Sequence, residues 1–118
     1  MSLFRAVPLS IHGVLEIVAA PVLIAAPFVL GFGYAAGAAS IALGALLMGL
    51  ALSTHGDVRT ITLSAHAGFD YVIAGLAIAA GSMLALADAP VVATVFLVGF
   101  GAAHLALTAS TRFSVRGA

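Results

Sequence analysis

Residues 8–34 read PLSIHGVLEIVAAPVLIAAPFVLGFGY, and a shift of 54 positions aligns them with residues 62–88, TLSAHAGFDYVIAGLAIAAGSMLALAD. Nine of the aligned positions are identical. Both segments open with Leu-Ser-x-His, followed four residues after the histidine by a carboxylate, Glu16 or Asp70. Each then continues as an apolar run long enough to cross a bilayer as a helix. The alignment predicts an internal repeat of membrane-spanning helices.

The composition of the chain is that of an integral membrane protein. Of its 118 residues, 64% are hydrophobic and 7% are charged, and the mean hydropathy is +1.28. Such a chain has too few polar side chains to cover the surface of a water-soluble globule. We expect a single transmembrane domain, residues 1–118, with the lipid bilayer as its surroundings. Its four apolar stretches, each near the roughly 20 residues that span a bilayer, are residues 8–32, 35–53, 62–86 and 89–110.

These stretches predict an all-α fold, an integral membrane four-helix bundle. The first repeat comprises residues 8–53 and the second comprises residues 62–110. Because each repeat holds two spans, both repeats have the same orientation, and we expect parallel hairpins related by a pseudo-twofold axis along the membrane normal. The positive-inside rule then places both termini in the cytoplasm, since the chain ends and the middle loop hold all four arginines, Arg5, Arg59, Arg112 and Arg116.

The ionisable residues of the spans are the candidate functional residues. Residues four apart share one helix face, so His12 stacks over Glu16 and His66 over Asp70. The fourth span runs in the opposite direction, and a rise of about 1.5 Å per residue brings His104 to the depth of the two carboxylates. Ionisable groups are costly in hydrocarbon, so their presence on membrane helices suggests a functional site. We therefore predict one inward-facing cluster of these five residues.

Four interpretations of this cluster are open. In the first, it is a buried polar network that fixes helix register in a structural or accessory membrane module, with Ser10 and Ser64 as further hydrogen-bond partners. In the second, imidazoles and carboxylates from facing helices bind a transition metal. In the third, His12 and His66 are the two axial ligands of a haem b. In the fourth, Glu16 and Asp70 titrate during proton or ion translocation and the histidines relay protons.

Other activities are not expected from this sequence. The chain has four arginines, no lysine and a formal net charge of zero, so it lacks the basic field that nucleic-acid binding needs. The sequence contains no nucleophile–base arrangement and no nucleotide-binding motif, and we expect no enzymatic activity. Small residues four apart let helices approach closely and also suit a homo-oligomer; they are Gly75 and Ala79, Ala45 and Gly49, and Gly99 and Ala103.

The first repeat also resembles a known family. Residues 25–32, AAPFVLGF, close the first span and precede a span of small residues. This stretch is similar to the motif of the SPW-repeat family of small bacterial membrane proteins, in which paired two-helix units carry a Ser-Pro-Trp type motif. Ala26 and Phe28 stand where the family has Ser and Trp, and the second repeat departs from the motif. The resemblance implies a four-helix fold in a bacterial plasma membrane and no catalytic residues.

Overall fold

The computed structural model describes residues 5–54 and 60–114. Arg59 and Arg116, on which the predicted orientation partly depends, lie outside this range. The four predicted spans are confirmed as helices, with ends within two residues of those expected. Each helix is long and apolar enough to cross a membrane, which indicates a multi-pass membrane protein. The helices are α1 (Leu9–Leu30), α2 (Tyr34–Ser53), α3 (Leu63–Leu86) and α4 (Val91–Ser110).

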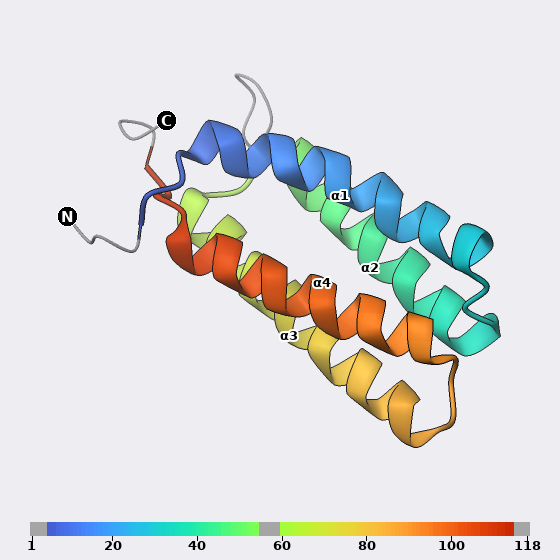
Figure 1. The fold of residues 1–118 in the computed structure, drawn as a ribbon. Coiled ribbons are helices and arrows are strands. Elements are labelled where there is room, and N and C mark those ends of the chain that lie inside the picture. The colour runs from blue at the N-terminus through green and yellow to red at the C-terminus, as the bar shows by residue number, and fades with distance from the viewer. Residues whose placement is uncertain (1–4, 55–59, 115–118) are drawn as a thin grey trace.

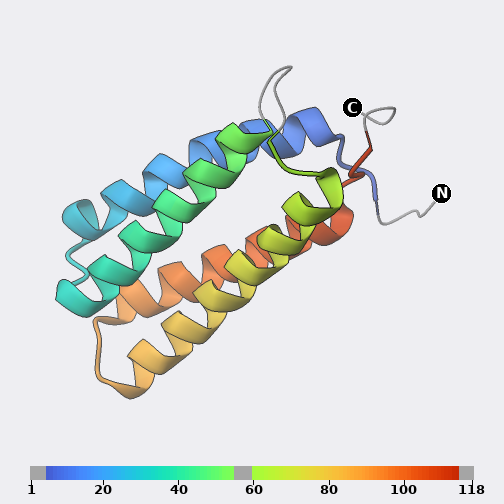
Figure 2. The ribbon, with the colours of Figure 1, turned by 180° about the vertical axis from the view of Figure 1, so that it is seen from behind.

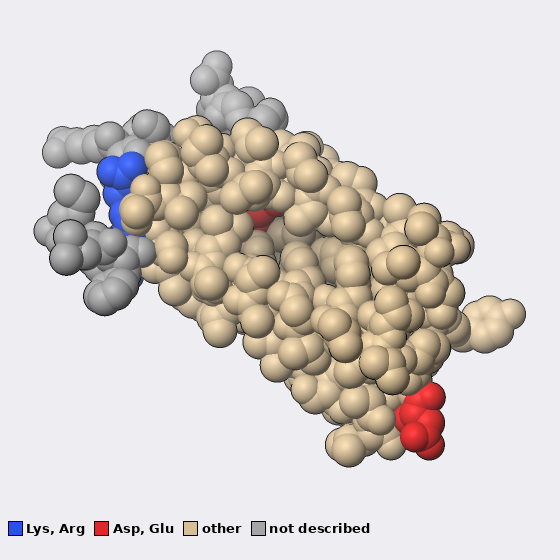
Figure 3. Space-filling view, viewed as in Figure 1, with Lys and Arg blue, Asp and Glu red and all other residues tan. Residues whose placement is uncertain are grey.

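The helices form two hairpins, α1 with α2 and α3 with α4, which lie side by side (Figures 1 and 2). The segments before α1 and after α4 meet at one end of the bundle, where the Val7 amide donates to the Ser110 carbonyl and the Arg112 amide donates to the Val7 carbonyl, both at 2.9 Å. On the face that Figure 3 shows, charged side chains gather at the two ends, apart from acidic atoms in a hollow between α1 and α4. The apolar belt between the ends suits a lipid environment.

The turn between α1 and α2 is built on two glycines. Gly31 ends α1 with φ +69° and donates its amide to the Pro27 carbonyl, and Gly33 precedes α2 with φ +78°. These left-handed backbone angles are readily adopted only by glycine. The turn places Phe32 inside the bundle, where its ring meets Phe96 edge to face at 5.4 Å. The side chain therefore connects the first hairpin to α4.

Glycines also set the close approach of the helices within each hairpin. A Cβ added at Gly44 of α2 would lie 2.9 Å from the Ala20 carbonyl oxygen of α1, and one added at Gly101 of α4 would lie 2.8 Å from the Ala74 carbonyl oxygen of α3. Neither position has room for a side chain. These two contacts place α2 on α1 in the same way as α4 on α3.

The small-residue pairs predicted to mediate helix contacts do not do so within the described chain. A Cβ added at Gly49, Gly75 or Gly99 would have no neighbour within 4 Å, so these glycines face away from the other helices. The prediction was wrong because spacing alone does not show which of several small-residue faces turns inward. The inward faces instead pack a core of Ala20, Leu23, Leu43, Leu47, Leu50, Ile73, Ala77 and Leu97.

Candidate functional site

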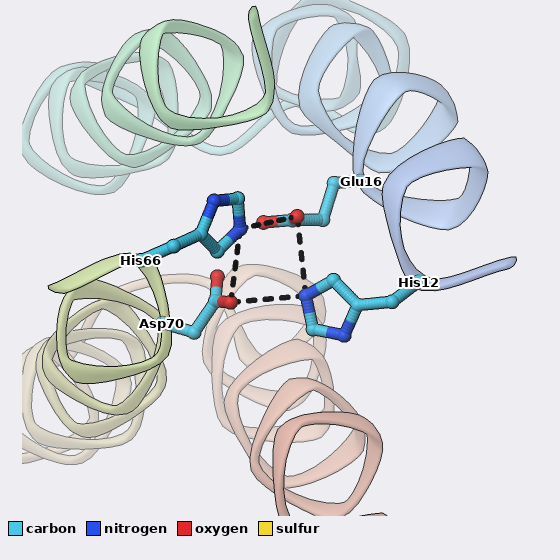
Figure 4. A group of neighbouring side chains, drawn as sticks. All are labelled: His12, Glu16, His66 and Asp70. Atoms are coloured by element: carbon cyan, nitrogen blue, oxygen red, sulfur yellow. Dashed lines mark hydrogen bonds and ion pairs between the residues drawn. The ribbon is translucent and has the colours of Figure 1, made fainter. Parts of the chain in front are cut away.

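Four of the predicted residues meet between the two hairpins. His12 and Glu16 come from the first turns of α1, and His66 and Asp70 come from the first turns of α3. Their side chains point toward one another (Figure 4), and each residue is at most 2% exposed. The four-residue spacing predicted this arrangement, because it aligns each histidine and carboxylate on the inward face of its helix.

The four side chains form a closed ring of alternating nitrogen and oxygen atoms (Figure 4). Each histidine turns its Nε2 atom toward both carboxylates. The His12 nitrogen lies 2.9 Å from Asp70 Oδ2 and 3.1 Å from Glu16 Oε1. The His66 nitrogen lies 2.9 Å from Glu16 Oε1 and 3.2 Å from Asp70 Oδ2. Each hairpin therefore makes the same contacts to the other, and we call these four residues the ring.

His104 of α4 joins the ring from one side. Its Nε2 atom lies 3.0 Å from Asp70 Oδ1, the carboxylate oxygen that the ring does not use. The Phe100 phenyl group, one turn earlier on α4, stacks on the His104 imidazole, with 5.4 Å between the ring centroids and an interplanar angle of 14°. The structure thus brings together all five ionisable residues that the sequence predicted to cluster.

The predicted supporting serines do not belong to the site. Ser10 and Ser64 lie on the exposed surface, and the Ser64 hydroxyl lies 3.2 Å from the Thr62 hydroxyl, just before α3. In the part of the chain that the structure describes, neither serine contacts the ring by a hydrogen bond. The prediction failed because a residue two positions before an inward-facing histidine lies on another face of the helix.

Two threonines, instead of the predicted serines, are the hydrogen-bond partners of the two ring histidines. Thr111, the residue after α4, has its hydroxyl 2.7 Å from His12 Nδ1. Thr54, the residue after α2, has its hydroxyl 2.8 Å from His66 Nδ1. Each threonine is brought to the site by the helix ending beside the start of α1 or α3. The two threonines are 57 positions apart, the interval that also separates the starts and the ends of α2 and α4. The 54-position shift of the repeat aligns Thr54 with Thr108 instead, so the repeat did not point to Thr111.

An aromatic side chain covers the ring at the end of the bundle where the chain termini meet. The Phe113 ring lies 5.2 Å from the His12 ring, edge on, and 6.1 Å from the His66 ring. Phe113 follows α4 by three residues, in the segment that the Val7 contacts hold in place. The apolar cover separates the ring from water on this side.

The hydrogen bonds of Thr111 determine which nitrogen of His12 carries a proton. The Thr111 hydroxyl donates to the Leu107 carbonyl at 2.6 Å, and a hydroxyl has only one hydrogen to donate. Thr111 therefore accepts from His12, whose Nδ1 atom is the donor. In consequence, His12 Nε2 either carries a second proton or directs a lone pair at two carboxylate oxygens. A lone pair in that position needs either a hydrogen on one of the carboxyl oxygens or a cation between the atoms.

The charges of the ring lead to the same two alternatives. Two buried carboxylates bring two negative charges into a low-dielectric interior, where unpaired charge is very costly. Two protons on the histidines would balance them, and so would one divalent cation bound by two neutral histidines. Each Nε2 atom faces two oxygens but can carry only one hydrogen. Two Nε2–H groups can therefore form hydrogen bonds along only two of the four sides of the ring, whereas a central cation can bind all four atoms.

The donor set and its dimensions fit a transition metal. One ligand atom from each ring residue lies within 4.8 Å of all the others. Tetrahedral Zn²⁺ with bonds of 2.0–2.2 Å separates each pair of its ligand atoms by about 3.4 Å. The four sides of the ring are 2.9–3.2 Å, so the side chains would move apart by a few tenths of an ångström to take the ion. The second nitrogen of each histidine already has a polar partner, as is usual for metal-binding histidines.

The same geometry does not fit a haem held by His12 and His66. An axially bound haem places its macrocycle between the two Nε2 atoms. Here Glu16 Oε1 and Asp70 Oδ2 lie within 3.2 Å of both nitrogens and fill that space. Two carboxylate oxygens between the axial ligands leave no room for the flat, apolar ring.

Comparison with known protein families, curated proteins and solved structures found no match for this chain.

Proposed function

We propose that this protein is a multi-pass membrane protein that binds one divalent transition-metal ion through His12, Glu16, His66 and Asp70. The observation that carries the proposal is the ring itself, in which four donor atoms from two hairpins converge. The imidazole and carboxylate ligands suit Zn²⁺, Fe²⁺ or Mn²⁺. The metal would join the two hairpins, because each supplies one histidine and one carboxylate.

The orientation and the charge of the ring residues both meet the requirements of a bound metal. The Thr111 hydroxyl holds the Nδ1–H of His12, so the lone pair of Nε2 is free to bind a metal. Two carboxylates, two neutral imidazoles and one divalent cation sum to zero charge, which the membrane interior favours. A protonated ring that only fixes helix register is the metal-free state of the same site.

Metal analysis of the detergent-purified protein tests the proposal. We expect one Zn²⁺ per chain after loading and removal of excess metal, and we expect Co²⁺ to give visible absorption bands of a four-coordinate site. Glu16→Gln and Asp70→Asn keep the side-chain shape but remove one charge each, and both should lose stoichiometric binding. Asp88→Asn makes the same chemical change at an exposed residue between α3 and α4 and should bind as the wild type does. Equal metal content in all four proteins, or none in any, would refute the proposal.

We further infer that the two hairpins are pseudo-twofold repeats. The reciprocal contacts of the ring, of the two threonines and of Gly44 and Gly101 support this relation. We also propose, from the arginine distribution and the resemblance to the SPW-repeat family, a bacterial plasma membrane location with both termini in the cytoplasm. A non-enzymatic role and homo-oligomerisation through the outward small-residue faces complete the proposal.

A further inference from the structure

A groove lies on the side of the bundle between α1 and α4, at the level of the ring. Its volume is about 340 Å³, within the size range of small-molecule sites. Its walls are mostly apolar, and its ionisable lining residues are Glu16 and His104. Figure 3 shows acidic atoms at the bottom of this hollow, and Glu16 is the acidic residue that lines it. The groove therefore connects the lipid-facing side of the helices to a carboxylate of the ring.

One oxygen of that carboxylate lacks a hydrogen-bond donor. Glu16 Oε1 faces the two histidines of the ring, whereas Glu16 Oε2 is buried and has no partner within residues 5–54 and 60–114. Leaving a charged acceptor unsatisfied in a buried position costs more than leaving a neutral one. A donor from outside the chain would remove this cost, and the groove leads to the residue that needs it.

The sequence explains why Glu16 Oε2 lacks a hydrogen-bond donor. The corresponding oxygen of Asp70 accepts from His104, three residues after Gly101. The residue three positions after Gly44, which packs on α1 as Gly101 packs on α3, is Leu47. Leu47 is fully buried and offers no hydrogen. The second hairpin thus provides its own donor to its carboxylate, and the first hairpin does not.

We propose that the groove binds a lipophilic alcohol or phenol, whose hydroxyl donates to Glu16 Oε2 and whose apolar part lies along α1 and α4. The ligand is uncharged, because the ring is balanced by a divalent cation or by two protons, and a cationic head group would add an unpaired charge at low dielectric. It is apolar beyond its head group, because the walls include Leu15, Val18 and Leu107. The site does not require the metal, since Glu16 Oε2 takes no part in the ring.

Photolabelling of the full chain in lipid nanodiscs tests this site. The probes are a diazirine-bearing hexadecanol, its methyl ether and a diazirine-bearing alkylphenol. Comparison of the hexadecanol with the alkylphenol shows whether the groove prefers an aliphatic alcohol or a phenol. The groove between α2 and α3 is the internal control, because it is also apolar, has a volume of about 500 Å³ and has no ionisable lining residue. We expect a hydroxyl probe to label the α1–α4 groove about tenfold more than the ether, the ratio that one net hydrogen bond to a charged acceptor supplies. The hexadecanol probe and its methyl ether should label the α2–α3 groove equally.

Two variants make the test decisive. Ala103→Leu fills the groove from its exposed side and should abolish the preference, while Ala102→Leu, at an exposed neighbour that does not line the groove, should retain it. Leu47→His supplies the donor from α2 and should also remove the preference for the hydroxyl probe. Equal labelling of the α1–α4 groove by alcohol, phenol and ether in the wild type would overturn the proposal, as would an undiminished preference in Ala103→Leu. Repeating the labelling after chelation separates this result from metal binding, because the preference should persist without metal.

Discussion

Replacement of Thr111 by valine tests how the protein prepares His12 for a metal. Valine keeps the shape of the buried threonine but removes the oxygen that accepts the Nδ1–H of His12 at 2.7 Å. Loss of such an outer partner typically lowers metal affinity by about 10- to 100-fold, or about 1.4 to 2.7 kcal/mol. The four ligands themselves remain, so the change in zinc affinity measures the loss of this outer partner.

The assay is a competition titration of detergent-purified protein with a chromophoric zinc chelator. Thr108→Val is the matched control, because Thr108, in the last turn of α4, is also buried but its hydroxyl has no partner among the described residues. We expect Thr108→Val to bind Zn²⁺ as the wild type does and Thr111→Val to bind it at least about tenfold more weakly. Equal affinities for Thr111→Val and the wild type would refute the assignment of the His12 proton.

Three further predictions concern packing, pH and the cover of the site. Gly101→Ala should destabilise the bundle by about 1–3 kcal/mol in mixed-micelle unfolding, because the added Cβ would lie 2.8 Å from the Ala74 carbonyl oxygen; Gly99→Ala, with no neighbour within 4 Å in the described chain, should not. Zinc affinity should fall as the pH is lowered through the histidine range, because protons compete for the imidazole nitrogens; a pH-independent titration would argue against histidine ligands. Phe113→Ala should speed zinc release to a chelator in stopped-flow measurements, because it opens the end of the site beside His12; an unchanged rate would mean that the metal leaves by another route.

The helices and the cluster were predictable because both depend on local spacing. A hydrophobic run of about 20 residues determines a span, and the four-residue interval in His12 to Glu16 and in His66 to Asp70 places each pair on one helix face. Depth along antiparallel helices then brought His104 to the same level. None of these inferences requires knowledge of how one helix packs on another.

The outer partners of the ring were not predictable in this way. Thr54 reaches His66 because α2 ends beside the start of α3, and Thr111 reaches His12 because α4 ends beside the start of α1. Phe113 covers the two imidazoles because the segment after α4 folds back over them. These contacts depend on helix rotation and chain direction outside the spans. The same dependence explains why outward-facing glycines such as Gly99 were expected at helix contacts, where the structure has Gly101.

X-ray absorption spectroscopy of the zinc-loaded protein is the most direct test of the central claim that two hairpins share one metal. The account predicts a first shell of four nitrogen or oxygen atoms at about 2.0–2.1 Å, with the outer-shell scattering of two imidazoles. In His66→Ala, loaded with enough zinc to fill the weakened site, the imidazole signal should halve. A spectrum of oxygen ligands alone, or one unchanged by His66→Ala, would contradict the account.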